Sequence, residues 1–165
     1  MRIRLVIGLC LAASLLPAQN NLTTAMTQRY FANIRKNLEA SAEAMPAEKY
    51  SFKLTADQMS FAEWLDHSIQ RNYADCDVLK GQDAKLRQLV THTEKTDIVK
   101  ALHDSFSYCE TVLATLDDAK VTSTPQMAYS FMHIAVHNNE IYGNIVGYLR
   151  ASGIVPPSTA ARQKK

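Results

Sequence analysis

Apolar side chains recur every three to four residues in four separate stretches of the chain. This is the periodicity of helices that each bury one face. The pattern predicts helices over residues 21–44, 60–80, 94–119 and 125–152. The second stretch shows it well, with apolar positions at Phe61, Trp64, Leu65, Ile69, Tyr73, Cys76 and Leu79. Four helices of this length with modest connections are typical of an all-α four-helix bundle.

Residues that cap or break helices mark the ends of these stretches. Thr23 or Thr24 is expected to cap the first helix, and Pro46 ends it because proline disfavours helix in the residue before it. Gly81 is expected to stop the second helix. The polar residues 158–165 are expected to form a disordered tail.

The N-terminus has the pattern of a secretory signal peptide. Arg2 and Arg4 precede an uncharged apolar run over residues 5–16. That run is shorter than the roughly 20 residues needed to span a bilayer. We therefore expect cleavage of residues 1–18 and export to the periplasm or the medium, with no stable membrane association afterwards. Residues 19–157 then form one bundle domain. The alternative is that the first segment stays as an anchor or a helix start.

Cleavage leaves a chain with balanced charge. The full chain has 18 Lys and Arg and 16 Asp and Glu residues, so the loss of Arg2 and Arg4 leaves 16 of each sign. Nucleic-acid binding usually requires a basic surface, so this balance gives no support for a nucleic-acid partner. The 165 residues are enough for one domain with a buried core. A small-molecule substrate is the partner class that we expect.

Two cysteines remain after cleavage, Cys76 and Cys109, and an oxidising compartment allows them to pair. If the second and third helices run antiparallel, however, Cys109 lies about ten residues further from their connection than Cys76. At 1.5 Å per residue the mismatch is roughly 15 Å, whereas a disulfide needs Cα atoms about 6 Å apart. A bridge and two buried free thiols are both open, and this geometry favours the thiols.

Three histidines are candidates for a metal site. His133 and His137 are four residues apart, so a helix places both on one face, and His67 belongs to another predicted helix. Neutral imidazole is a common ligand of zinc and related divalent ions, and three protein ligands leave an open position for water. The competing interpretation of each histidine is a polar residue at the border of the core or on the surface.

Two segments resemble the DinB-like family. They are residues 50–67, YSFKLTADQMSFAEWLDH, and residues 137–157, HNNEIYGNIVGYLRASGIVPP. The first is similar to the family's loop and second helix, and the other to its last helix and ending. The likeness covers nearly all of the mature chain. It implies a four-helix bundle, frequently a homodimer, with a divalent metal ion held by three histidines. Some relatives are thiol-dependent transferases or metal-dependent hydrolases, and many have no assigned activity.

By position, His67 and His137 match two of the metal ligands that the resemblance implies. The third position falls at Ile141, whose side chain cannot bind a metal. His133, one turn before His137, is the substitute. The centre of the last helix's apolar stripe is taken at Met127, Ile134, Ile141 and Ile145. At 100° per residue His133 lies about 100° from this centre and His137 about 60°, so His133 is expected to point further from the core. Glu140 is a weaker alternative oxygen ligand.

Two functions are compatible with these residues. The first is an exported enzyme that uses zinc, nickel or manganese, held by His67, His133 and His137. It would act as a transferase with a small thiol or as a hydrolase. The second is a non-catalytic helical module that binds a ligand or a partner, with a metal site that is degenerate at Ile141. The substrate is open in the first case, and so is the ligand in the second.

Overall fold

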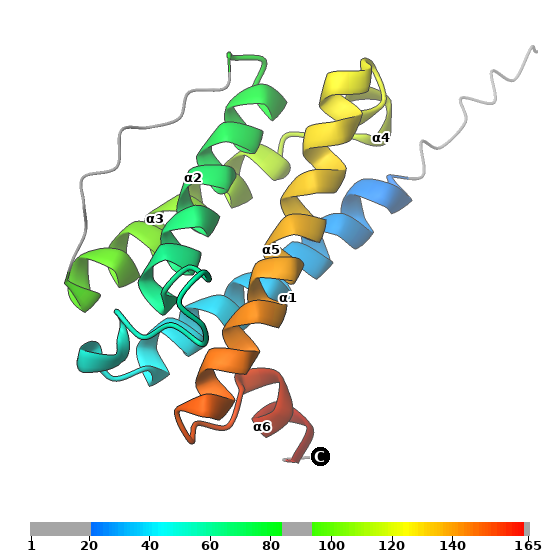
Figure 1. Ribbon diagram of the computed structural model, residues 1–165. Helices are drawn as coiled ribbons and strands as arrows, with labels where there is room; N and C mark the ends of the chain where they lie inside the picture. The colour runs from blue at the N-terminus through cyan, green and yellow to red at the C-terminus, as the bar shows by residue number, and fades with distance from the viewer. Residues whose placement is uncertain (1–20, 84–93, 164–165) are drawn as a thin grey trace, which may run out of the picture.

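The computed structural model describes residues 21–83 and 94–163, which are all-helical and contain no strand. Four long helices form a bundle, with short helical segments beside their ends (Figure 1). The long helices are α1 (Leu22–Ala44), α2 (Phe61–Leu79), α3 (Lys95–Leu113) and α5 (Pro125–Ala151). The short segments are η1 (Ala47–Lys49), α4 (Asp118–Val121) and α6 (Pro157–Gln163). The predicted all-helical class is confirmed.

The apolar faces of the long helices meet in one core. Helix α2 packs against α3 and α5, and α1 packs against the same two helices from the other side. The largest fully buried side chains are Phe31, Leu38, Met45, Phe61, Leu65, Leu79, Ile98, Leu102, Phe106, Leu113, Ile134 and Tyr148. Of the four residues predicted at the centre of the last helix's apolar stripe, Ile134, Ile141 and Ile145 are 0% exposed, and Met127 is partly buried against the core. The hydrophobic periodicity therefore identified the buried face of α5 correctly.

Helices α2 and α3 run in the same direction, and α1 and α5 run against them (Figure 1). In the contacts between α2 and α3, the residue numbers increase in the same direction along both helices. Asn72 donates a hydrogen bond to Ser105, and one turn further Cys76 is bonded to Cys109. The assumption that these two helices are antiparallel is therefore wrong, and both begin at the same end of the bundle.

Cys76 and Cys109 form a disulfide, with Cα atoms 5.6 Å apart. The preference for free thiols was wrong because it rested on antiparallel helices. In the parallel arrangement each cysteine lies within the last turns of its helix, since α2 ends at Leu79 and α3 at Leu113. The mismatch of level disappears, and the bridge ties the C-terminal ends of α2 and α3 together.

Local capping explains where α2 and α5 begin. The Ser60 hydroxyl accepts a hydrogen bond from the Glu63 backbone N–H at 3.2 Å, and the Glu63 carboxylate accepts one from the Ser60 N–H at 2.6 Å. This capping box satisfies two backbone donors at the start of α2. Thr124 caps α5 with a single bond, in which its hydroxyl accepts from the Met127 N–H. After α2, Gly81 has a φ of +83°, a conformation that favours glycine, so its predicted role as a stop is confirmed.

Helix α1 is capped by a residue from another helix. The backbone N–H groups of Thr23 and Thr24 donate to the Asp118 carboxylate, at 3.1 and 2.8 Å. The bond from Thr24 is the main reason that the pKa of Asp118 is lowered. The N-cap residue itself is Asn21, whose side chain makes no capping bond. The expectation that Thr23 or Thr24 caps α1 is wrong because the capping group comes from a distant part of the chain.

The third predicted helix is divided in two. Its first part, α3, ends at Leu113 rather than at residue 119. The side chain of Asp117 then accepts a hydrogen bond from the Lys120 N–H at 2.7 Å and caps the separate short helix α4. Because α4 begins as a separate helix, the Asp118 carboxylate lies where it reaches the N-terminus of α1.

The end of the chain is more ordered than its composition indicated. Residues 158–163, expected in a disordered tail, belong to helix α6. The Tyr142 hydroxyl of α5 donates to the Ser158 hydroxyl at 2.8 Å and accepts from the Ser158 N–H at 3.1 Å, which docks α6 on α5.

The predicted signal peptide, residues 1–18, lies outside the described residues. Among the helices that are described, none is long and apolar enough to cross a membrane.

Removal of the disulfide will lower the free energy of unfolding. The variant with both Cys76→Ala and Cys109→Ala should lose about 4 kcal/mol in urea unfolding, because the bridge spans 33 residues and restricts the unfolded chain. A reductant should destabilise the wild type and leave the double variant unchanged. A wild-type midpoint that does not respond to the reductant would contradict the bridge.

The capping box should make stability depend on pH. Hydrogen bonds from Ser60, the backbone N–H first, lower the pKa of Glu63 below its ordinary value of 4.5. A carboxyl group with a lower pKa in the folded state stabilises the protein above pH 4.5, and this contribution is lost as pH falls through the folded pKa. In urea unfolding, Glu63→Gln should therefore be less stable than the wild type at pH 7, with the difference shrinking below pH 4.5. A difference independent of pH would contradict this role.

Candidate functional site

Two histidines from different helices meet where α2 lies against α5. The Nε2 atoms of His67 and His137 are only 2.8 Å apart. Their rings are nearly perpendicular, at 82°, with centroids 4.9 Å apart. The two residues are 70 positions apart in the chain, so only the packing of α2 on α5 brings them together. They are two of the three site residues predicted from the sequence.

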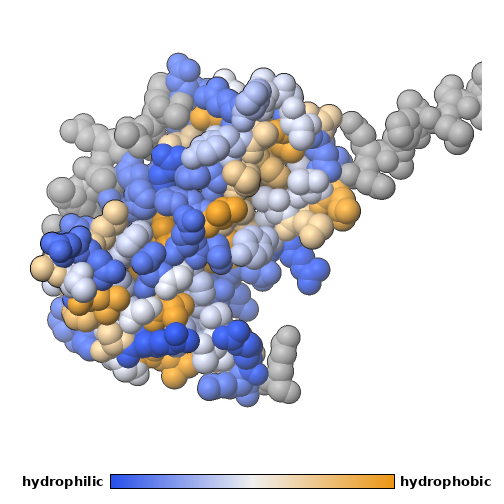
Figure 2. Space-filling view, turned by 45° about the vertical axis from the view of Figure 1, so that its right-hand side comes forward, coloured by the Kyte–Doolittle hydropathy of each residue, from blue (hydrophilic) through white to orange (hydrophobic). Residues whose placement is uncertain are grey.

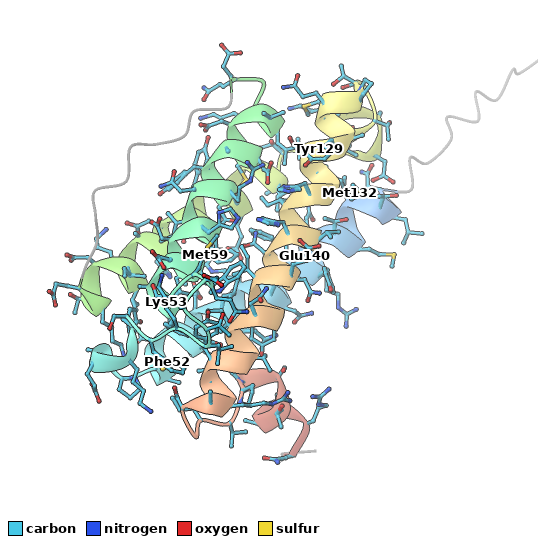
Figure 3. The ribbon with its side chains drawn as sticks, viewed as in Figure 1. Phe52, Lys53, Met59, Tyr129, Met132 and Glu140 are labelled. Carbon is cyan, nitrogen blue, oxygen red and sulfur yellow. A yellow bond between two sulfur atoms is a disulfide. The ribbon has the colours of Figure 1, made fainter. Side chains whose placement is uncertain are left out.

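His133 joins this pair through a stack of rings along α5. Its ring lies on that of His137, with centroids 4.7 Å apart and an angle of 18°. Tyr129 stacks on His133 in turn, at 5.1 Å and 20°. Figure 3 shows Tyr129 and Met132 on the upper part of α5, and Glu140 further along the helix. The three predicted histidines thus form one group, which we call the histidine cluster.

His133 is as well covered by protein as His137. Their side chains are 19% and 21% exposed. The prediction from helical angles, that His133 points further out, is wrong because a neighbouring helix covers it. The Nδ1 atom of His133 lies 2.7 Å from the carboxylate of Asp75, which belongs to the C-terminal half of α2.

Asp75 is a site residue that sequence reasoning missed. It is 2% exposed, and its two oxygens bond His133 at 2.7 Å and the Arg71 guanidinium at 3.1 Å. A buried carboxylate requires such partners, because an unpaired charge in the core is strongly unfavourable. The available signal was the four-residue spacing from Arg71 to Asp75, which pairs an acid with a base on one helix face. That spacing is common, and it does not reveal that α5 covers the pair.

Two carboxylates determine where the protons of the cluster lie. The Nδ1 atom of His137 is 3.1 Å from the Glu140 carboxylate, as the Nδ1 of His133 is close to Asp75. Ionised carboxylates only accept hydrogen bonds, so each Nδ1 carries a proton and each neutral ring has a bare Nε2. Next to a neutral His137, His67 then donates its own Nε2–H to the Nε2 of His137. Glu140, an alternative metal ligand in the sequence analysis, instead orients the ring of His137.

The surroundings favour the neutral form of His67. Burial lowers the pKa of His67 below its ordinary value of 6.5, and the nearby His137, Arg71 and His133 lower it further. Its imidazole is therefore uncharged at neutral pH. An uncharged ring has one nitrogen lone pair, which is what both a hydrogen bond and a metal ion require.

The cluster fits a divalent ion in part. Two bonds of about 2.1 Å at the tetrahedral angle place two nitrogens about 3.4 Å apart, so His67 and His137 need to separate by only about 0.6 Å. A metal ion that is bound by an imidazole nitrogen lies in the plane of that ring. The rings of His133 and His137 are stacked, so one ion cannot lie in both planes, and the His133 ring must turn to become a ligand. Within residues 21–83 and 94–163, no three His, Cys, Asp or Glu side chains stand in a metal-binding arrangement.

Ile141 and His103 are not part of the histidine cluster. Ile141, at the position where the resemblance implies a ligand, is fully buried in the apolar core. His103 lies on the opposite side of the bundle, where its Nδ1 is 3.1 Å from Arg35 of α1. Of the three ligand positions that the resemblance implies, two are therefore occupied by histidines of the cluster, and the one at Ile141 offers no ligand atom.

Comparison with known proteins does not identify a family. No protein-family model matches the chain, and no curated protein matches it either. The functional argument accordingly rests on the geometry of the histidine cluster. Three imidazoles in contact, two of them oriented by carboxylates, can share a proton or take up a cation.

Loss of the Asp75 charge should destabilise the protein. Asp75→Asn keeps the size of the side chain but weakens its bonds to both His133 and Arg71, so we expect a loss of about 1.5–3 kcal/mol in urea unfolding. The matched control is Asp104→Asn, which removes the acid of an exposed pair with Lys100 at the same spacing and should change little. Equal effects of the two substitutions would show that the buried bonds of Asp75 contribute no more to the free energy of unfolding than an exposed ion pair does.

Proposed function

We propose that this protein is an exported, DinB-like helical-bundle protein whose histidine cluster binds one divalent metal ion. His67 and His137 supply two nitrogens, and His133 supplies the third after its ring turns. The observation that supports this proposal is the 2.8 Å approach of the two Nε2 atoms. Packing of α2 on α5 does not by itself require two imidazoles to meet nitrogen to nitrogen. Zinc, nickel and manganese are the candidate ions.

The carboxylates beside the cluster favour the same conclusion. Metal-binding histidines commonly donate their second ring N–H to a carboxylate, which orients the ring and makes the ligand nitrogen more basic. Glu140 and Asp75 accept from the Nδ1 atoms of His137 and His133 in this manner. His67 differs from the other two, because its proton must move from Nε2 to Nδ1 before Nε2 can bind an ion.

The proposed reaction is a hydrolysis or a transfer to a small thiol. A bound ion with an open position supplies chemistry by lowering the pKa of water or by polarising a substrate. Export favours hydrolysis, because low-molecular-weight thiols are chiefly cytoplasmic cosubstrates. Tyr129 is 53% exposed and stacks on His133, so it borders the cluster on the solvent side and is available to contact a substrate.

The alternative function is a non-catalytic module. The fully buried Ile141 at a ligand position favours it, and so does an open groove of about 830 Å³ between α1 and α3. Ala40 and Val99 give this groove apolar lining, and Lys36 and Glu43 bring charges to it. It lies on the opposite side of the bundle from the contact of α2 with α5, so a small ligand there would meet His103 but not the histidine cluster.

The homodimer implied by the resemblance remains part of the proposal. Exposed apolar side chains lie along α1 and the first half of α5, beside a groove of about 410 Å³. They are Leu22, Met26, Tyr30, Tyr129, Met132 and Val136. Figure 2 shows hydrophobic side chains gathered where α1 begins. An exposed apolar patch of this kind is a suitable surface for a second copy.

Metal titration tests the proposed function. Metal-free mature protein is titrated with Zn²⁺, Ni²⁺ and Mn²⁺ by calorimetry, and we expect one ion per chain for at least one of them. His67→Ala and His137→Ala should abolish binding. Glu140→Gln should weaken it by about 10- to 100-fold, because that carboxylate only orients a ligand. His103→Ala, on the other side of the bundle, is the matched control and should bind like the wild type.

Two more variants separate the alternatives. His133→Ala should weaken binding if the His133 ring turns to become the third ligand. A wild-type chain that binds none of the three ions would overturn the proposal and favour the non-catalytic module. In that case Ile141→His should create an affinity that the native chain lacks. Because Ile141 is fully buried, an unfolding curve must accompany this variant to show that it folds.

A further inference from the structure

A continuous chain of polar side chains crosses the core beside the histidine cluster. Its four members, Ser68, Asn72, Ser105 and Asn138, are each 0% exposed. Ser68 donates to the Asn138 amide oxygen at 2.6 Å, and Asn138 donates to the Asn72 amide oxygen at 2.8 Å. Asn72 donates to the Ser105 hydroxyl at 3.1 Å. The chain therefore joins α5 to α2 and α2 to α3.

Each member of this chain is bonded within it or to the backbone. Asn138 uses its second amide hydrogen on the Ile134 carbonyl at 2.7 Å, and Ser105 donates to the Leu102 carbonyl at 2.8 Å. Buried polar groups are unfavourable unless they are bonded, so a shift of one helix against another breaks bonds that water cannot replace. Apolar contacts tolerate such a shift better because they are not directional. The polar chain thus selects one arrangement of the three helices.

Two of these hydrogen-bonded polar residues lie next to the histidines in the sequence. Ser68 directly follows His67, and Asn138 directly follows His137. The bond between Ser68 and Asn138 fixes the rotation of α2 and α5 at the level where the two imidazoles meet. A rotation of about 10° moves an atom that lies about 6 Å from a helix axis by about 1 Å. That displacement is enough to break a 2.8 Å hydrogen bond.

We propose that Ser68 and Asn138 are positioning residues that hold His67 and His137 in nitrogen-to-nitrogen contact. They act through the helices and touch neither a substrate nor an ion. The contact itself does not require metal binding. Its consequence for metal affinity rests on the proposed function.

Ser105, the last of the four hydrogen-bonded polar side chains, supplies a matched control. Ser105 belongs to α3, and its hydroxyl accepts from Asn72, so this bond joins α2 to α3. Ser68→Ala and Ser105→Ala each remove one buried hydroxyl from the chain and leave one amide group without its partner. Their effects on stability should therefore be similar. Only Ser68→Ala removes a bond between the helices that carry the histidines.

Nuclear magnetic resonance of metal-free protein with ¹⁵N-labelled histidine tests the positioning role. The wild type should show a downfield, slowly exchanging His67 Nε2–H proton, coupled to the Nε2 of His137. The signal should disappear in Ser68→Ala and Asn138→Ala and persist in Ser105→Ala. Urea unfolding of every variant shows whether it is folded. Absence of this proton from the wild type, its persistence in folded Ser68→Ala, or equal loss in Ser105→Ala would overturn the proposal.

A second measurement separates this inference from the proposed function. Zn²⁺ affinity should fall at least about tenfold in Ser68→Ala, as for other groups that orient ligands, and stay unchanged in Ser105→Ala. Equal Zn²⁺ affinities of Ser68→Ala and the wild type would overturn the positioning role. A wild type that binds no Zn²⁺, Ni²⁺ or Mn²⁺ overturns the metal proposal alone, because the bridging proton is measured without metal.

Discussion

Directional bonds on two sides of helix α2 hold the bundle in one arrangement. Toward α3 these are the disulfide from Cys76 and the hydrogen bond from Asn72 to Ser105. Toward α5 they are the bond that Ser68 donates to Asn138 and the bond that His133 donates to Asp75. Apolar packing supplies most of the driving force for folding, but it is not directional. The helices can therefore meet in several registers by burial alone, and the bonds of α2 select one of them.

The histidine cluster depends on that register. His67 and His137 can share a proton through their Nε2 atoms, or they can share an ion there, but not both at once. The hydrogen-bonded form needs a proton on His67 Nε2, whereas an ion needs that position bare. Burial and the neighbouring basic groups already disfavour the charged form of His67. His67 is thus uncharged, and carboxylates orient the other two rings, before any ion arrives.

The two sides of the bundle use polar residues differently. On the side of α1 and α3, Arg35 bonds Glu39 and Glu110, whose side chains are 28% and 44% exposed, so water competes for both carboxylates and the ion pairs contribute little. Between α2 and α5, Asp75 and Asn138 are buried, and nothing replaces a partner that moves away. Geometry is therefore specified most strongly where the histidines lie, and least at the open groove on the other side.

The sequence by itself determined the features that depend on neighbouring residues. Helical periodicity located the face that contains Ile134 and Ile145, and Gly81 marked the end of α2, because both act over one or two turns. It also named His67, His133 and His137 as candidates. Only the tertiary structure decided that α2 and α3 are parallel, which brings Cys76 to Cys109, and that α5 lies over Asp75. Helix direction depends on packing between distant segments, and no local pattern records it.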